Sequence, residues 1–321
     1  MILITGAAGF IGSCMVARFN ESGASNLILS DDFSRKDKQA NFETKSYQTR
    51  VERTELFPWL KKNGQKISLV IHLGARTDTA EMQQPIFDIL NINFSKDIWR
   101  FCCEQEVPLI YASSAATYGD GSAGFSDEPG KTGLLQPLNP YGWSKHTFDQ
   151  WVYQQEKTPP FWTGLKFFNV YGPNEYHKGR MASVIFHAFH QIKTTGELHL
   201  FRSHRPDFGD GEQMRDFIYV KDVVNIIHHL TIYGKKPGIY NLGTGRARCF
   251  NDLGRQVFTS MGLEEKIRYI DTPIDIRNSY QYFTEADMQR FEANICPWDF
   301  TSLEEGTDQY IRHYLLLNRY Y

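Results

Sequence analysis

Tyr141 and Lys145 are the residues whose types and spacing most clearly suggest chemistry. Asn139 suits the N-cap of a helix and Pro140 its first turn. Tyr141 and Lys145 are four residues apart, so they would stand on one face of that helix. A phenol ordinarily has a pKa of about 10, but a neighbouring ammonium favours the phenolate. The pair could therefore remove a proton from an alcohol, which the hydroxyl of Ser114 could bond and orient.

A glycine-rich turn near the start of the chain is the strongest binding signal. Three glycines with the spacing G-x-x-G-x-x-G separate the apolar residues 1–4 from the amphipathic run 13–19. Such glycines let the chain turn tightly, and they let backbone N–H groups and a helix N-terminus approach a pyrophosphate. The sequence therefore predicts a dinucleotide site formed by Gly6, Gly9, Phe10, Ile11 and Gly12.

Charged residues after the second predicted strand bear on which dinucleotide binds. Asp31 and Asp32 lie about twenty residues beyond the last glycine. An acidic side chain there can accept hydrogen bonds from the adenosine ribose, which favours NAD. Nearby cations could instead hold the 2′-phosphate of NADP, and these are Arg35, Lys36, Lys38 and Arg53. Charge alone leaves NAD and NADP both open.

The elements that must position these residues follow from the hydrophobic pattern. Short apolar runs alternate with amphipathic segments, which is the spacing of βαβ units. Parallel strands need crossover connections, so the predicted fold class is α/β, a Rossmann-type doubly wound parallel sheet with a smaller α/β substrate lobe. Ligands of such a sheet bind at the carboxyl ends of its strands. The predicted strands are residues 1–4, 27–30, 68–73, 109–112 and 164–168.

The boundary between the two lobes is predicted to be discontinuous. We expect a dinucleotide-binding domain over residues 1–167, with a returning segment near 216–241. The substrate-binding domain is expected over 168–215 and 242–321, with a helix near 181–193 and aromatic-rich helices towards the end.

The composition indicates a small-molecule ligand rather than a nucleic acid or a membrane. The 321 residues carry a formal charge of -2, and charges of both signs are spread along the chain, so there is no basic stripe. No apolar run approaches the ~20 residues that span a bilayer. Five cysteines without a C-x-x-C pair suggest neither a disulfide framework nor a zinc site, so no metal is expected. We therefore expect reduced thiols and a cytoplasmic protein.

Together these residues form a pattern that resembles the extended short-chain dehydrogenase/reductase family. Beyond the motifs above, the resemblance rests on HLGA at 72–75, FNVYGP at 168–173, RDFIYVKD at 215–222 and NLGTG at 241–245, and it covers nearly the whole chain. It implies a nicotinamide cofactor, whose ribose Lys145 would hold, and a nucleotide-diphosphate sugar as substrate. Further cofactor contacts that the resemblance implies are Leu73, Gly74, Ala75, Asn91 and Val170.

Within this family, residues 175–187 are similar to the ADP-L-glycero-D-manno-heptose 6-epimerase subfamily, as are 111–119, 243–247 and 280–287. This resemblance implies epimerisation of ADP-D-glycero-D-manno-heptose by transient oxidation of carbon 6 with NADP, in the synthesis of lipopolysaccharide core precursors. It gives acid/base roles to Tyr141 and Lys178, and it implies a homo-oligomer, with a pentamer as the candidate assembly. The implied substrate contacts are Ser114, Asn169, Arg180, His187, Phe201, Arg215 and Tyr280.

Other activities fit the pattern less well. A 4,6-dehydratase needs acidic groups beside the serine, where this chain has Ala115 and Ala116. A UDP-hexose 4-epimerase, or another nucleotide-sugar oxidoreductase of the family, is the alternative, and the Lys178 segment distinguishes it. A net dehydrogenase would consume its cofactor, and a nucleotide sensor would not need a poised phenol. Arg180 stands where the subfamily has a serine and the 202–214 loop looks longer, so the nucleotide stays open.

Overall fold

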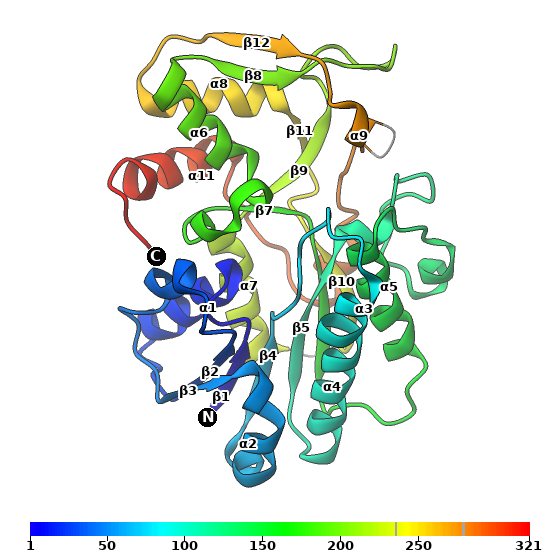
Figure 1. Ribbon diagram of the computed structural model, residues 1–321. Helices are drawn as coiled ribbons and strands as arrows, with labels where there is room; N and C mark the ends of the chain where they lie inside the picture. The colour runs from blue at the N-terminus through cyan, green and yellow to red at the C-terminus, as the bar shows by residue number, and fades with distance from the viewer. Residues whose placement is uncertain (235, 278–279) are drawn as a thin grey trace.

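A seven-stranded sheet forms the larger lobe of the computed structural model, which describes residues 1–234, 236–277 and 280–321. The strand order is β10-β6-β5-β4-β1-β2-β3, and all neighbouring strands are parallel (Figure 1). These strands are β1 (Ile2–Thr5), β2 (Leu27–Asp31), β3 (Thr49–Glu52), β4 (Leu69–His72), β5 (Leu109–Ser114), β6 (Trp162–Phe167) and β10 (Gly238–Leu242).

Helices cover both faces of this sheet. Leu3 faces a core that includes Trp99, whereas its neighbour Ile4 faces the core that includes Val16. A strand buried on both faces needs apolar residues at successive positions, which explains the continuous apolar runs of the sequence. The helices of this lobe are α1 (Phe10–Glu21), α2 (Leu56–Asn63), α3 (Gln84–Phe87), α4 (Phe94–Glu104), α5 (Pro140–Tyr153) and α7 (Val220–Tyr233).

The strand order reverses between β1 and β4, and this reversal locates the site. The chain runs from β1 outward to β2 and β3, and then crosses to β4 on the other side of β1. Diverging connections leave a crevice beyond the carboxyl ends of these two strands, where open α/β sheets bind ligands. The glycine turn follows β1 directly, so it lies at this crevice.

The smaller lobe is built on a mixed sheet and lies above the large sheet in Figure 1. Strand β9 pairs with β7 in parallel and with β11 antiparallel, while β8 and β12 form a separate parallel pair. The chain returns through α7, which packs on α1, to β10 beside β6. This lobe contains β7 (Asn169–Tyr171), β8 (Leu198–Phe201), β9 (Met214–Tyr219), β11 (Ala247–Cys249), β12 (Ile267–Ile270), α6 (Val184–Thr195), α8 (Phe250–Met261), α9 (Ile274–Arg277) and α11 (Leu303–Tyr310). Helix α10 (Gln289–Asn294) packs against β10 of the large sheet.

The predicted fold class is confirmed, whereas the residue boundaries of the two domains stay a prediction. No described helix combines the length and the apolar character that a bilayer crossing requires. Short 3-10 or π turns complete the chain at η1 (Lys36–Asn41), η2 (Arg53–Glu55), η3 (Gly64–Lys66), η4 (Asp88–Asn93), η5 (Ala115–Tyr118), η6 (Pro129–Leu134), η7 (Tyr176–Met181) and η8 (Ile311–Leu315).

Candidate active site

The first turns of α5 bring Tyr141 and Lys145 to the carboxyl end of β5. Asn139 caps the helix, since its Oδ1 accepts the N–H of Gly142 at 2.8 Å. Ser114 is the last residue of β5, and a side-chain hydrogen bond joins it to Tyr141. The phenol and the serine hydroxyl therefore meet where a parallel sheet presents its ligand site, as an alcohol-binding pair requires.

Burial, rather than a neighbouring cation, dominates the ionisation of this pair. Burial raises the pKa of Tyr141, and the hydrogen bond with Ser114 lowers it in part. Lys145 is buried one turn further along α5, and its Nζ donates to the carbonyl oxygen of Ala112 at 2.8 Å. Burial lowers the pKa of Lys145 to about 8, against a smaller raising effect of Asp149. The expected depression of the Tyr141 pKa is therefore not present in the structure, because desolvation of the phenol is the larger effect.

A buried ion pair supports the floor of the site, and sequence reasoning did not find it. Asp149 and Lys166 are fully buried with Nζ and Oδ2 2.9 Å apart. Asp149 also accepts the hydroxyl of Ser113 at 2.6 Å, and Lys166 donates to Thr117 at 2.7 Å. The pair thus fixes the residues on both sides of Ser114. The available signal was the position of Asp149, one helical turn beyond Lys145 on the same face.

His72, at the end of β4, links α4 to the residue that precedes the glycine turn. Its Nδ1 lies 2.6 Å from Oγ1 of Thr5, which immediately precedes the turn, and its Nε2 lies 2.9 Å from the hydroxyl of Ser95. Burial, with a further contribution from Lys145, lowers the pKa of His72 to about 3. The imidazole is therefore neutral at physiological pH, and its two ring nitrogens connect Thr5 to Ser95 by hydrogen bonds.

This neutral histidine predicts a loss of stability in acid. An unfolded histidine has a pKa of about 6.5, so between about pH 3 and pH 6.5 the unfolded chain binds one more proton than the folded chain at this residue. The stabilisation is complete above pH 6.5 and is lost as the pH falls. We expect about 1.4 kcal/mol of unfolding free energy to be lost per pH unit below 6.5. Urea unfolding of the protein and of His72→Gln measures this, and equal pH slopes for both would contradict it.

The glycine turn has the geometry of a dinucleotide cradle. Gly6 has a φ of +68°, and a Cβ there would lie 2.6 Å from the backbone nitrogen of Gly74. A Cβ on Gly12 would overlap the carbonyl oxygen of Gly6, which also accepts the N–H of Gly9 at 3.0 Å. The N–H groups of residues 10–12 begin α1 and have no partner within the helix. These residues fit a bound pyrophosphate, because small side chains and free N–H groups are what that group needs.

The segment after β4 is held directly against this cradle. The N–H groups of residues 73 and 74 donate to the main-chain and side-chain oxygens of Thr5, each at 3.2 Å. Asn91 holds the residue that follows Ala75, since its Oδ1 accepts Arg76 N at 2.8 Å and its Nδ2 donates to Arg76 O at 3.0 Å. The same amide donates to Ser144 at 2.9 Å. Asn91 thus ties this segment to α5, a positioning contribution beyond the predicted cofactor contact.

The rim beyond β2 carries paired charges of both signs. Asp31 is buried, and its carboxylate accepts the N–H groups of Ala8 at 2.9 Å and Asp32 at 2.7 Å. It also pairs with Nζ of Lys38 at 2.9 Å, while Asp32 lies 3.9 Å from Arg53. A ribose or a 2′-phosphate that binds at this rim would therefore compete with ion pairs that these side chains already form with one another.

Lys178 approaches the cradle from the smaller lobe. Its Nζ lies 5.2 Å from the ring centroid of Phe10, the first residue of α1. Burial lowers the pKa of Lys178, while Glu175 opposes that shift. Glu175 is itself fully buried and accepts the N–H and hydroxyl of Ser183 at 2.5 and 2.6 Å. Lys178 therefore belongs to a segment whose conformation is held by the buried carboxylate of Glu175, through its hydrogen bonds with Ser183.

Three of the predicted substrate contacts meet in the smaller lobe. Arg215 is buried, its guanidinium lies 5.3 Å from the ring centroid of Tyr280, and it donates to the carbonyl oxygen of Gln281. The ring of Phe201 lies edge-on to Tyr280 with centroids 6.0 Å apart. An arginine between aromatic rings can hold a phosphate while a base stacks beside it.

The other predicted substrate contacts are more dispersed. Asn169 is exposed on β7, where its Oδ1 accepts the hydroxyl of Thr284 at 3.5 Å, and Val170 is the next residue of that strand. Arg180 and His187 are exposed on η7 and α6. Among the described residues, no hydrogen bond or ion pair joins either of these two to Arg215. Their roles stay predictions.

Comparisons with known proteins agree with this geometry. Residues 2–243 match the NAD dependent epimerase/dehydratase family. The chain belongs to this family. It is 43% identical over 325 aligned positions to the ADP-L-glycero-D-manno-heptose-6-epimerase of Fusobacterium nucleatum, and 44% identical over 323 to that of Nitratidesulfovibrio vulgaris. Both alignments cover 98% of each chain. The crystal structure of the Helicobacter pylori ADP-L-glycero-D-manno-heptose-6-epimerase matches with a TM-score of 0.81 and 26% identity, covering 97% of this chain and 95% of that one.

Membership in the NAD dependent epimerase/dehydratase family agrees with the nicotinamide cofactor expected from the glycine turn. The family match ends at residue 243, but the relatives align over nearly the full length, so the substrate lobe is shared with them as well.

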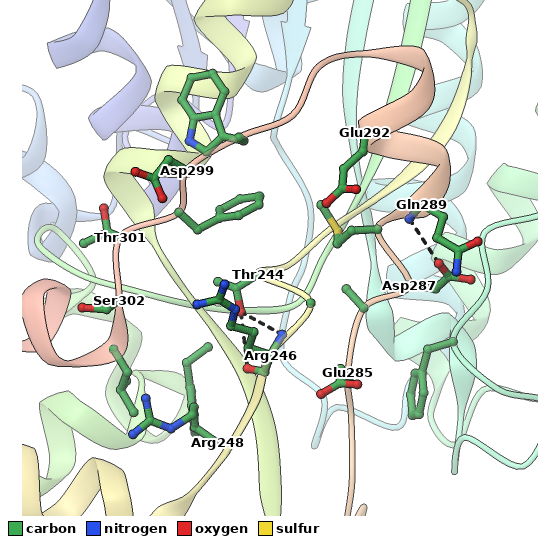
Figure 2. A pocket seen from close by; sticks show the side chains of 18 of the residues that line it. Thr244, Arg246, Arg248, Glu285, Asp287, Gln289, Glu292, Asp299, Thr301 and Ser302 are labelled. Carbon is green, nitrogen blue, oxygen red and sulfur yellow. Dashed lines mark hydrogen bonds between the residues drawn. The ribbon is translucent and has the colours of Figure 1, made fainter.

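A separate cavity of about 780 Å³ lies between residues 244–248, at the start of β11, and residues 283–304. Figure 2 shows Thr244, Arg246 and Arg248 on one side and the acidic Glu285, Glu292 and Asp299 around them. None of the residues predicted for catalysis, cofactor or substrate lines it. We therefore assign it no part in the reaction.

Proposed function

We propose that this protein is an ADP-L-glycero-D-manno-heptose 6-epimerase, which converts ADP-D-glycero-D-manno-heptose to its L-glycero epimer in the synthesis of lipopolysaccharide core precursors. The observation that carries the proposal is the near full-length identity of 43–44% to two proteins with that name. The placement of Lys178 beside the glycine turn supports it, because this segment distinguishes a 6-epimerase from a UDP-hexose 4-epimerase.

Two acid/base groups on different sides of the substrate are what an epimerase of this kind needs. Tyr141 belongs to α5, whose Phe148 packs on one face of the large sheet. Lys178 contacts Phe10 of α1, which packs on the other face. We propose that both groups face the crevice beyond the strand ends, because Tyr141 follows the end of β5 and Lys178 contacts the first residue after the glycine turn. This arrangement supports proton removal on one side of carbon 6 and proton delivery on the other.

The chain's own residues carry the remaining work. Ser114 would bond the carbon 6 hydroxyl and Tyr141 would take its proton, and Lys178 would give a proton to the carbon 6 oxygen when the hydride returns to the opposite face. Arg215, with Tyr280 beside it, would hold the nucleotide end of the substrate. Hydride removal from carbon 6 and its return to the opposite face is the chemistry that a bound nicotinamide cofactor supplies. The ammonium of Lys145 would hold the cofactor ribose.

We further propose NADP as that cofactor, with NAD as the alternative. Three N–H donors already bond the carboxylate of Asp31, which leaves it about one of its four acceptor positions for a ribose hydroxyl. Lys38 and Arg53 stand at the same rim and could turn to a 2′-phosphate. Heat release of the bound dinucleotide, followed by its chromatographic identification, tests this, and recovery of NAD alone would overturn it.

The assembly and compartment belong to the same proposal. We propose a homo-oligomer with a pentamer as the candidate, and a two-domain division at residues 1–167, 168–215 and 242–321 with a return near 216–241. A cytoplasmic location is supported by the five unpaired cysteines, which fit a reducing compartment.

The substrate assignment is tested with two nucleotide sugars. Purified protein is incubated separately with ADP-D-glycero-D-manno-heptose and with UDP-glucose, and the products are identified by NMR. We expect a mixture of the two heptose epimers from the first and unchanged UDP-glucose from the second. Conversion of UDP-glucose alone would favour the 4-epimerase and overturn the proposal.

A further inference from the structure

The last residues of the chain, 316–321 (the C-terminal tail), are bound to the segment that carries Lys178. Tyr321 donates its main-chain N–H to Oδ1 of Asn174 at 2.8 Å, and Nδ2 of Asn174 donates to Tyr321 O at 2.9 Å. The same Nδ2 lies 2.9 Å from the hydroxyl of Ser13 in α1. One buried amide thus joins the tail, the Lys178 segment and the helix of the glycine turn.

A second set of contacts holds Tyr176, two residues before Lys178. Its hydroxyl donates to the carbonyl oxygen of Arg319 at 2.8 Å. Its ring packs against Tyr320 with centroids 4.9 Å apart, and it stacks on Tyr310 of α11 at 6.5 Å. The tail therefore contacts this segment on both sides of Glu175, the carboxylate that orders it.

The tail is anchored in turn to the larger lobe. The hydroxyl of Tyr321 donates to Glu21 of α1 at 2.8 Å, and Lys45 donates to the main-chain oxygen of Tyr321. Nζ of Lys221 lies 4.6 Å above the Tyr321 ring. Figure 1 shows the C-terminal end beside α1. The tail therefore bridges the C-terminal end of α1 and the segment of Lys178, and Asn174 connects that segment to Ser13 near the start of α1.

The backbone of this segment needs such support. Asn174 has a φ of +74°, a left-handed conformation that non-glycine residues adopt infrequently, and its carbonyl oxygen accepts Nδ2 of Asn41 at 3.2 Å. A side chain that satisfies three partners at once can hold such a turn in one geometry. Lys178 follows four residues later, so the position of its Nζ depends on this turn.

We propose that the C-terminal tail is a positioning element for Lys178, and that it sets the distance of this lysine from the substrate carbon. The inference rests on the proposed function. Among the described residues the tail contacts the Lys178 segment, α1, Lys45 and Lys221, and no hydrogen bond or ring contact joins it to α5. Its loss therefore affects proton transfer by Lys178 and leaves proton transfer by Tyr141 intact.

The test separates the two sides of the reaction with cofactor-loaded enzyme. Each heptose epimer is mixed rapidly with the protein, and the absorbance of the reduced cofactor reports the first oxidation. The two epimers present opposite faces of carbon 6, so each is oxidised with a different acid/base group as the proton acceptor. The epimer that Lys178→Met oxidises more slowly than the parent is therefore the one that depends on the lysine. The variants are a chain ending at residue 318 and Asn174→Gly, in which glycine keeps the positive φ and loses only the amide. Leu317→Ala, an exposed tail residue, is the matched control.

We expect both variants to slow oxidation of the Lys178-dependent epimer by roughly 10²-fold, the cost of a misplacement of about 1 Å, and to leave the other epimer within about twofold. Amide exchange should quicken in residues 175–183 and not in α5. Equal slowing of both epimers, or no slowing, would overturn the inference. If the parent enzyme oxidises neither epimer, the proposed function itself fails, which is a distinct result.

Discussion

Replacing Tyr141 by phenylalanine is expected to lower the rate of heptose epimerisation by roughly 10²–10⁴-fold, the usual contribution of a positioned acid/base group. The variant loses the hydroxyl that bonds Ser114 and keeps the ring. Cofactor affinity should therefore be unchanged, because the glycine turn and Lys145 are untouched. Steady-state rates by product NMR and cofactor titration by intrinsic fluorescence measure the two quantities.

A second tyrosine of α5 provides the control for this experiment. Tyr153, at the end of the same helix, has a buried hydroxyl with no hydrogen-bond partner among the described residues. Tyr153→Phe should retain the full rate, since no predicted site residue depends on it. If Tyr141→Phe kept more than about a tenth of the parent rate, the acid/base role of Tyr141 would be refuted.

Loss of Asp149 is expected to destabilise the protein by about 3–5 kcal/mol, the cost of leaving one partner of a buried ion pair uncompensated. In Asp149→Leu the ammonium of Lys166 stays buried with Thr117 as its remaining polar partner. Ser113 also loses its acceptor, so the strand end next to Ser114 should loosen. Urea unfolding gives the change in free energy, and the epimerisation rate gives the effect on the site.

Two comparisons isolate the buried charge as the cause. The double variant Asp149→Leu/Lys166→Met removes both charges and should recover most of the lost stability. The exposed pair Asp97–Arg100 is the matched control, and Asp97→Ala should change the free energy by less than about 1 kcal/mol. A double variant as unstable as Asp149→Leu would show that packing, rather than charge, carries the effect.

Much of the larger lobe could be predicted because buried parallel strands have a strong sequence signal. Five strands were expected within about two residues of their observed bounds, and each is buried at nearly every position. Strand β3 was missed because only Val51 of its four residues is buried, as befits an edge strand. Strand β10 was expected only as part of a returning segment, since its pairing with β6 spans a large sequence separation.

The site was predictable where local motifs encode it. The helix cap at Asn139 and the spacing of Tyr141 and Lys145 follow from neighbouring residues, and the structure has both. The ionisation of Tyr141 was not predictable, because it depends on desolvation by residues far apart in sequence. The same holds for Lys166, whose partner Asp149 belongs to another element, and for the contacts of Tyr321.

The contact between the glycine turn and the segment after β4 makes these two loops one unit for any redesign of coenzyme preference. A methyl group on Gly6 would meet the backbone of Gly74, so neither loop can change its course alone. Residues 32–40 are partly or fully exposed, and they can vary without shifting that contact. Directed libraries that aim to exchange one dinucleotide for another should therefore be confined to this rim.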